Sequence, residues 1–449
     1  MERDAIDFKK ESVGKLFVRM FVPTLLGMVL TATITIADGV FVGHGVGSDA
    51  LAAVNIVAPF FMLSTGIGLM FGTGCSIVAS IHLAHNKRKA ANINVTQSLI
   101  VSVLLMVFLC AIVLLFRKEV AYALGASDRL MPFVMEYMTI IMPFLPMNML
   151  LSIGLFVIRL DGSPRYAMWC NAVAGGVNVV LDYLFVFPFG WGLAGAAWAT
   201  GIAEIVGALM VCFYLLFYSK VLKLYRLKFS YKSLRLTLRN VGYMIRLGFS
   251  SLLSELAIAF MMLVGNFVFM DLLHEDGVAA YSVACYCFPI IFMICNAIAQ
   301  SMQPIVSYNY GLHHIVRVRK AFAYGLLAAV GVGVVVSVGA LFLSRPLVGL
   351  FLSSELPAYI FAVEGMPYFA SGALFFALNI ICIVFLQSLE YFKTAAFLML
   401  LRGFVLVGLM FVFLPMFMSV KGAWLAVPLT EGITFVGVAL YLFCSKKRY

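Results

Sequence analysis

The segment from Phe17 to Val42 decides the fold of this chain, and its residues 19–42 read RMFVPTLLGMVLTATITIADGVFV. As one helix it can cross a lipid bilayer, because about 20 apolar residues at a rise of about 1.5 Å each span about 30 Å of hydrocarbon. The segment nevertheless contains Asp38. A charged side chain near the centre of a span costs about 2.5–3.5 kcal/mol, so this carboxylate requires a partner, a water-filled cavity or a function.

The composition extends this reading to the whole chain. Its 449 residues are 63% hydrophobic and only 11% charged, whereas about a quarter of the residues of a soluble protein are charged. Apolar runs continue from end to end and indicate an all-α integral membrane protein. The charged segment Met1–Lys15 leads directly into the first span, so we expect no cleavable signal. The nine cysteines form no CxxC or zinc spacing and are expected to be small buried apolar residues.

The hydropathy pattern predicts twelve membrane spans. They cover approximately residues 17–42, 52–83, 92–116, 132–158, 166–187, 193–218, 242–270, 278–305, 318–343, 361–388, 394–414 and 421–444. Of the 31 Lys and Arg residues, 26 fall on the side of the N-terminus and 5 on the other side. This bias predicts that both termini are cytoplasmic. The net charge of +11 is therefore a topology signal, and no nucleic-acid partner is expected.

A basic segment, residues 219–241, lies at the midpoint of the chain. It has no long apolar run, and we interpret it as a partly amphipathic cytoplasmic linker along the headgroups. The segment separates six predicted spans from six others. The sequence thus predicts an N-terminal lobe over residues 1–218 and a C-terminal lobe over residues 242–449.

The two predicted lobes are similar in sequence. Three matched pairs of residues occur in the same order at nearly constant separations of 227, 231 and 227 positions. The pairs are Arg19 and Arg246, Lys89 and Lys320, and Glu204 and Glu431. Because six spans return the chain to the same side, such a duplication predicts two six-helix bundles related by a pseudo-two-fold axis along the membrane normal. A central cleft between the bundles is where alternating-access transporters bind substrate.

Four oxygen-bearing residues of the predicted N-terminal lobe are expected at similar depth. Asp38 and Asp182 lie near the outer ends of their spans, and Thr200 lies two turns into the next span. Asn178 is one helical turn from Asp182 and shares its face. Two carboxylates, a carboxamide and a hydroxyl can hold a monovalent cation or share protons. The plainer alternative is that either acid only caps a helix or lies at headgroup depth.

Three further acids lie inside predicted spans. Glu204 and Glu431 occupy equivalent positions of the two halves, which favours a structural hydrogen bond in each. Glu255 lies near mid-membrane and has no acidic counterpart in the other half. An intramembrane acid of this kind is a candidate functional residue.

Four stretches of the chain resemble the multidrug and toxin extrusion (MATE) family of bacterial inner-membrane drug exporters, and the resemblance covers the whole chain. They are PTLLGMVLTATITIADGVFVG (23–43), NVVLDYLFVFP (178–188), GLAGAAWAT (192–200) and QPIVSYNYG (303–311). The resemblance implies twelve spans in two lobes and export of drugs or toxins.

In the DinF-type branch, which this chain resembles most, an Asp of span 1, an Asn and an Asp of span 5 and a Thr of span 6 form the cation site. By matching motifs these residues are Asp38, Asn178, Asp182 and Thr200, and the coupling ion is H⁺ or Na⁺. Pro23 would be the hinge at which the first span bends. The resemblance implies no further cofactor.

The NorM-type branch instead uses a Glu of span 7 and an Asp of span 10. Glu255 matches the first of these acids, but the tenth span contains no Asp, and only Asn379 or Gln387 offers a polar group there. The second lobe therefore has only one of the two acids that this branch uses.

The expected function is cation-coupled antiport of lipophilic organic cations by a monomer in contact with membrane lipids. No Walker A pattern occurs, so an ion gradient is the expected energy source. The alternative of a lipid-linked precursor flippase of the same wider superfamily calls for a more cationic interior. An intramembrane enzyme would need a base or metal ligands at membrane depth, and only His82 falls inside a predicted span. A receptor or scaffold would not need acids at matched depth.

Overall fold

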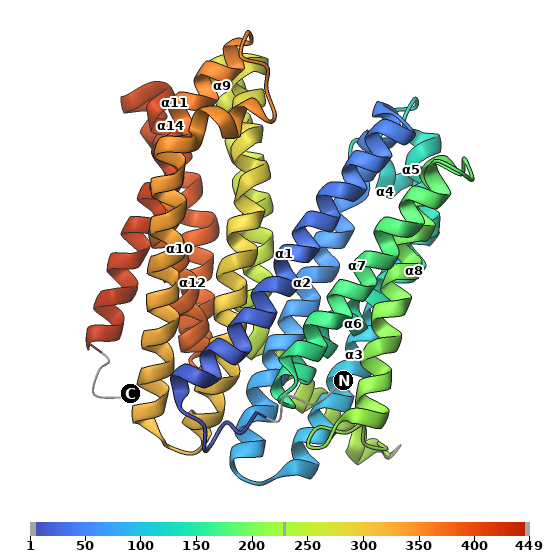
Figure 1. The fold of residues 1–449 in the computed structure, drawn as a ribbon, viewed down its shortest axis with the longest axis vertical. Helices are drawn as coiled ribbons and strands as arrows, with labels where there is room; N and C mark the ends of the chain where they lie inside the picture. The colour runs from blue at the N-terminus through green and yellow to red at the C-terminus, as the bar shows by residue number, and fades with distance from the viewer. Residues whose placement is uncertain (1–5, 228–229, 445–449) are drawn as a thin grey trace. The chain divides into compact units, whose positions relative to one another are not determined.

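The computed structural model describes residues 6–227 and 230–444, and within these residues it contains helices and no strand. The chain forms two compact units. The first comprises residues up to Glu11 together with Val18–Leu252, and the second comprises Ser12–Phe17 together with residues from Leu253 onward. Figure 1 shows both as bundles of long helices.

The first unit contains nine complete helical elements besides most of α1 and the beginning of α9. They follow the order α1 (Val13–Gly45), α2 (Ser48–Ala84), α3 (Arg88–Leu115), α4 (Arg117–Ala123), α5 (Met131–Ile141), the 3₁₀ turn η1 (Met142–Phe144), α6 (Leu145–Leu160), α7 (Pro164–Val186), α8 (Gly192–Phe213), the π-helical turn η2 (Tyr214–Tyr218) and α9 (Tyr231–Gly311). Since α5, η1 and α6 are continuous, they form one span.

The second unit contains the remainder of α9 and six further helical elements. They are α10 (Ile315–Gly349), α11 (Pro357–Ala370), α12 (Ala373–Ser388), α13 (Phe392–Leu400), the π-helical turn η3 (Leu401–Leu406) and α14 (Val407–Cys444). The axes of α11 and α12 differ by 42° across a short break, and the two helices together form one span.

Two of the long helical segments each contain two spans. The backbone of α9 is non-helical at His274, and that of α14 is non-helical at Ser419. Among the described residues, nine helical segments are long and apolar enough to cross a membrane, or ten when α11 and α12 are counted as one. Dividing the two broken segments gives the twelve spans that the sequence predicts, so the predicted fold class is confirmed.

The turns of the two units carry the same backbone signature. Residues with positive φ recur at nearly constant separation, 227 positions in three cases and 228 in the fourth. The pairs are Gly47 and His274, Asn86 and His313, Gly162 and Glu390, and Gly192 and Ser419. An independent backbone observation therefore supports the duplication that the sequence predicts.

The beginning of α9 packs within the first unit. Gly74 of α2 and Gly248 of α9 let the two backbones approach so closely that a Cβ atom at either glycine would collide with a carbonyl of the other helix. Near the start of α9, Gln97 donates a hydrogen bond to Thr237 (2.8 Å), and Asn240 donates one to Gln97 (3.1 Å). Helix α9 thus begins inside the segment interpreted as a linker.

The first residues of that segment are also ordered by hydrogen bonds. The Asp161 carboxylate accepts the backbone N–H groups of Val221 (2.9 Å) and Leu222 (2.8 Å) and the hydroxyl of Tyr214 (2.7 Å). The buried Asp161 carboxylate at the end of α6 therefore provides hydrogen-bond acceptors for the backbone N–H groups that follow η2.

Helix α3 illustrates how the sequence divides between interior and lipid. Its polar residues Asn94, Gln97 and Ser98 are buried, whereas Leu104 and Phe108 are exposed. In a bilayer the polar groups must find partners within the protein, and apolar side chains can face the hydrocarbon. This pattern explains why the chain is apolar throughout.

Candidate functional site

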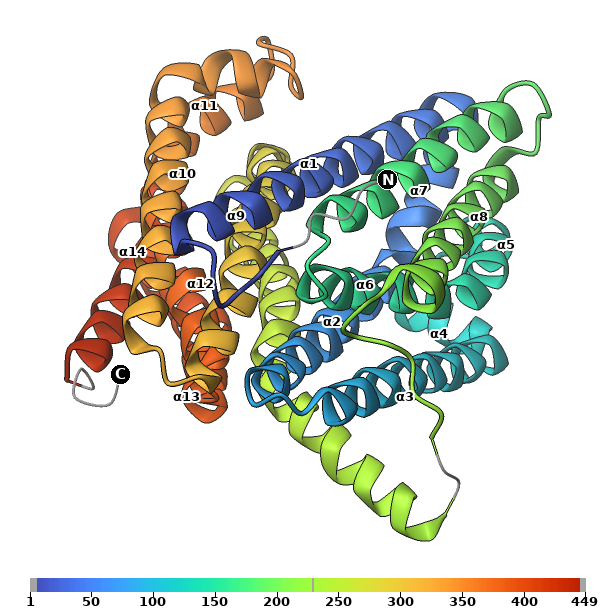
Figure 2. The same ribbon diagram turned by 60° about the horizontal axis from the view of Figure 1, so that its bottom comes forward.

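Close packing between α1 and α7 brings the predicted cation-site residues together. A Cβ atom at Gly27 would contact Met168 and Asn171 of α7, and one at Gly175 of α7 would collide with Ile34 of α1. The two helices lie side by side in both ribbon views (Figures 1 and 2). The small residues permit the close approach that carries Asp38 toward α7.

Asp38 and Asp182 form the centre of the site. Asp182 is fully buried and Asp38 is partly buried. The two carboxyl groups interact electrostatically. Two ionised carboxylates close together repel each other, so a proton or another cation between them would stabilise the pair.

Donors from the surrounding protein do not satisfy these acids. Neither oxygen of Asp182, nor Oδ1 of Asp38, accepts a hydrogen bond of good geometry from a described residue. A buried carboxylate without donors is strongly unfavourable. The arrangement is therefore one that a bound cation or proton would stabilise.

The two neutral residues predicted for the site lie beside the acids. Asn178 is buried one turn before Asp182, and its side-chain amide donates a hydrogen bond to Thr200 Oγ1 of α8 at 3.3 Å. The side-chain carbonyl oxygen of Asn178 takes no part in this hydrogen bond. The structure therefore brings together all four side chains, and their oxygens are the ligand type that hard monovalent cations and protons prefer.

Tyr137 is a site residue that the sequence analysis missed. It comes from α5, is buried, and interacts electrostatically with both Asp38 and Asp182. A tyrosine in an apolar span is most often a packing residue, so its sequence context gave no signal. Its phenol group adds a hydrogen-bond donor close to the acid pair.

Comparison with known proteins identifies the family. The MatE family profile matches residues 23–184 and 251–414, which is more than half of the chain and includes both halves.

The chain belongs to the MatE family.

Relatives of this MatE chain cover almost its full length. Multidrug export protein MepA of Staphylococcus aureus (strain NCTC 8325 / PS 47) is 21% identical over 446 residues, which cover 98% of this chain and 96% of the relative. A solved structure of a multidrug resistance MATE family transporter of the MOP superfamily, in an outward-facing conformation, is 21% identical, with a TM-score of 0.89 and 98% of each chain covered. A MOP superfamily transporter from Pyrococcus furiosus is 20% identical, with a TM-score of 0.89 over 97% of this chain and 96% of the other.

Two further predicted residues of this MatE chain lie outside the acid cluster. Pro23 lies inside α1, which is helical from Val13 to Gly45 without interruption, so its role as a hinge stays a prediction. Glu255 lies on α9 in the second unit and forms neither a hydrogen bond nor an ion pair with another described residue. A second-lobe cation site at Glu255 also stays a prediction.

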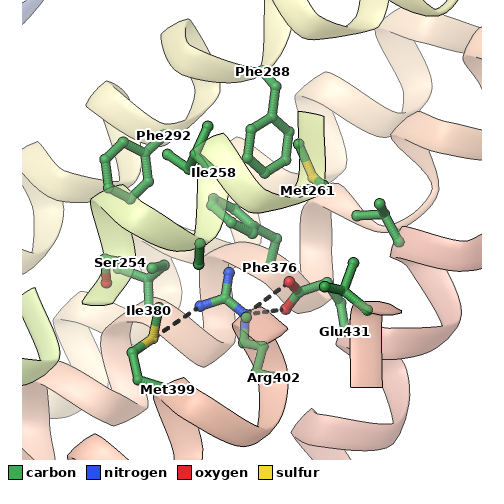
Figure 3. Close-up of a pocket in the computed structure, with 14 residues that line it drawn as sticks. Ser254, Ile258, Met261, Phe288, Phe292, Phe376, Ile380, Met399, Arg402 and Glu431 are labelled. Carbon is green, nitrogen blue, oxygen red and sulfur yellow. Dashed lines mark hydrogen bonds and ion pairs between the residues drawn. The ribbon is translucent and has the colours of Figure 1, made fainter. Parts of the chain in front are cut away.

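Glu431 has a different environment, which Figure 3 shows at the edge of a pocket. The Arg402 Nε donates to Glu431 Oε1 at 2.7 Å and to Oε2 at 2.8 Å. Asn379 donates to Oε2 at 2.8 Å and to the Glu431 backbone carbonyl at 2.9 Å. The guanidinium of Arg402 also lies over the Phe376 ring, 4.6 Å from its centroid. The expected structural hydrogen bond of Glu431 is thus present, within a larger network.

The positions of Arg402 and Arg159 correct the charge count made from sequence. The 26 Lys and Arg residues assigned to the side of the N-terminus include both, but Arg402 is buried within η3 and paired with Glu431. Arg159 is buried at the end of α6. The sequence does contain a signal for this buried charge, because Arg402 is a basic residue inside the eleventh predicted span, 394–414.

Proposed function

We propose that this chain is a secondary multidrug exporter that exchanges H⁺ or Na⁺ for lipophilic organic cations by alternating access. The observation that carries the proposal is the Asp38–Asp182 pair, two interacting acids whose buried oxygens accept no hydrogen bond from a described residue and which a proton or cation would stabilise. The name of the S. aureus relative, a multidrug export protein, supports drugs as the substrate class. The flippase alternative is less favoured, because the basic residue Arg402 is neutralised by Glu431.

The proposed cycle uses the acid pair as an exchange site. A cation entering from outside neutralises the repulsion between Asp38 and Asp182, and α1 then changes shape around Pro23. One charge crossing 100 mV supplies about 2.3 kcal/mol, which can drive such a transition. The rearrangement lowers the affinity for a bound organic cation, which leaves on the external side.

The proposed organisation follows from the charge distribution and the duplication. Two lobes, residues 1–218 and 242–449, are joined in the inner membrane by the basic segment 219–241, whose last residues begin α9. The excess of Lys and Arg on the N-terminal side supports cytoplasmic termini. Removing buried Arg402 and Arg159 from the count leaves that bias intact. The exporter is proposed to act as a monomer without any further cofactor.

The proposal predicts that the acid pair is required for coupled transport. In proteoliposomes with an imposed ion gradient, Asp38→Asn and Asp182→Asn should each lower ethidium efflux at least about tenfold, because loss of one charge-assisted interaction of about 1.5–3 kcal/mol corresponds to about that factor. Efflux at the wild-type rate in both variants would refute the assignment.

A matched control removes an acid elsewhere in the same unit. Glu136 of α5 is exposed, so Glu136→Gln changes the charge without touching the acid pair. This variant should transport at the wild-type rate. If all three variants lose transport equally, the effect is one of general charge and not of the site.

A further inference from the structure

We propose that Glu204 of α8 is a second proton-binding site of the first unit, distinct from the Asp38–Asp182 pair. The inference rests on the proposed function, because it adds a second exchangeable proton to the same transport cycle. It is carried by two observations: an unsatisfied buried oxygen at Glu204, and the different way in which the second unit completes the equivalent arrangement.

The surroundings of Glu204 satisfy only one of its two oxygens. Asn148 of α6 donates a hydrogen bond to Oε1 at 2.9 Å, and the carbonyl oxygen of Asn148 accepts one from Ser64 of α2 at 3.1 Å. Oε2 is buried and receives no hydrogen bond from any residue in the described ranges. A buried carboxylate oxygen without a donor is costly, whereas a protonated carboxyl group at the same place carries no charge to compensate.

The second unit contains the same pair of residue types. Asn379 of α12 donates to Glu431 of α14 at 2.8 Å, as Asn148 does to Glu204. The two glutamates are 227 positions apart and the two asparagines 231 positions apart, within the range of separations that relates the two halves. The Asn–Glu pair is therefore a duplicated element.

The two copies differ in what neutralises the glutamate. In the second unit, Arg402 contributes a permanent positive charge and donates to both oxygens of Glu431. The residue 227 positions before Arg402 is Gly175, which has no side chain and packs against Ile34. The described residues of the first unit therefore offer Glu204 no tethered cation. A proton can take the place that the arginine occupies in the second unit.

The chemistry of the site favours a proton over a metal ion. Sodium and other hard cations need several oxygen ligands, whereas the side-chain partner of Glu204 is a single amide group. No cluster of three or more His, Cys, Asp or Glu residues is present in the described parts of the chain.

The elements packed against α8 bring no charged group to compensate Glu204. These elements are α5, η1, α6 and α7, with η2 as the continuation of α8. Their charged and phenolic groups interact elsewhere or face outward. Tyr137 and Asp182 belong to the acid pair, Arg159 lies over the Phe156 ring, Tyr166 donates to the Met210 carbonyl, and Tyr214 is bonded to Asp161 and Ser163. The exposed residues are Glu136, Arg165 and Tyr183. Glu204 is left with Asn148 as its polar partner.

Two polar residues, Thr200 and Asn178, join α8 to α7 near the two proposed proton sites. Thr200 lies four residues before Glu204, so the two side chains share one face of α8. Thr200 accepts the hydrogen bond of Asn178, which lies one turn from Asp182 on α7. Glu204 therefore lies about one helical turn further along α8 than the acid pair. A second proton at this position would neutralise the Glu204 carboxylate at the helix interface just beyond the first site.

Infrared titration of the purified protein in detergent tests the proposal without transport. Between about pH 5 and about pH 9, the wild-type spectrum should contain a protonated-carboxyl band that Glu204→Gln lacks and that Asp38→Asn/Asp182→Asn retains. Gln at position 204 can still accept the Asn148 hydrogen bond, so the fold should persist. A Glu204→Gln spectrum identical to that of the wild type over this range would overturn the proposal.

Proton counting on substrate binding provides the second test. With ethidium as the probe and a pH-sensitive dye in weakly buffered detergent solution, Glu204→Gln should release about one proton fewer than the wild type, and Glu204→Asp should restore it. An unchanged count in Glu204→Gln would overturn the assignment while leaving the acid-pair proposal intact. Wild-type efflux by Asp38→Asn and Asp182→Asn would instead refute the proposed function.

Discussion

At the residue scale, the Arg402–Glu431 ion pair shows how the chain holds a charge within a membrane span. Only 5% of the Arg402 side chain and 6% of the Glu431 side chain are exposed. Removing two charges from water is costly, and hydrogen bonds must offset the loss. Here Asn379 contributes such a bond to the carboxylate, and the Phe376 ring lies against the guanidinium. The pair therefore stabilises the fold only while it is complete.

Removing one member of the Arg402–Glu431 pair should lower the free energy of unfolding more than removing both charges. We expect Arg402→Met to lower the free energy of unfolding by about 3–5 kcal/mol, because it leaves a buried charge uncompensated. The double variant Arg402→Met/Glu431→Gln should recover most of this loss, since Gln can still accept the Asn379 hydrogen bond. Denaturant unfolding in detergent measures both values. A double variant no more stable than the single one would contradict this account.

Tyr137 permits a test of the acid pair that changes no charge. Tyr137→Phe removes one hydroxyl beside Asp38 and Asp182, and we expect the concentration of coupling ion at half-maximal efflux to change about tenfold. Tyr183→Phe on the exposed side of α7 is the matched control and should behave as the wild type. Equal behaviour of the two variants would exclude Tyr137 from the site.

At the element scale, the duplicated turns place different residues at a positive φ. Gly47 between α1 and α2 has φ 115°, and its counterpart His274 within α9 has φ 54°. Glycine adopts positive φ without steric cost, whereas a residue with a Cβ atom is strained there. The second copy therefore has a positive φ that its sequence does not favour, held in place by the helices on either side.

Exchanging the residue types at these turns should have opposite effects. Gly47→Ala should lower the free energy of unfolding by about 1–2 kcal/mol, and no atom lies within 4 Å of the added Cβ, so the cost is conformational. His274→Gly should raise stability by up to about 1 kcal/mol, because relief of strain outweighs the added freedom of the unfolded chain. Thermal unfolding in detergent provides the comparison. The same sign in both variants would contradict the reading of the turns.

At the scale of the whole molecule, hydropathy and chain direction were sufficient to predict the fold and the meeting of the four site residues. Every backbone group in a bilayer must be paired, which restricts apolar runs to helices. Counting residues from the span ends then placed Asp38 and Asp182 at similar depth. The same procedure did not place Arg402, which lies inside the predicted span 394–414 but was assigned with the basic residues of the loops. Nor could it find Tyr137, since packing between helices leaves no periodic signal in sequence.

The start of α9 shows a second limit of sequence reasoning. The basic composition of residues 219–241 indicated a linker, but the helix begins at Tyr231 and packs on α2 through Gly74 and Gly248. Contact between helices determines this boundary. The basic composition of a segment indicates only that its surface faces water or lipid headgroups.

The central claim is that an ion gradient acting at the acid pair drives export. Ethidium efflux from proteoliposomes, measured with a pH gradient and a sodium gradient imposed separately, tests it most directly. The account predicts that at least one gradient accelerates efflux by the wild type and that neither accelerates efflux by Asp38→Asn/Asp182→Asn. Efflux that is equally fast without any gradient, or a double variant that responds like the wild type, would contradict it.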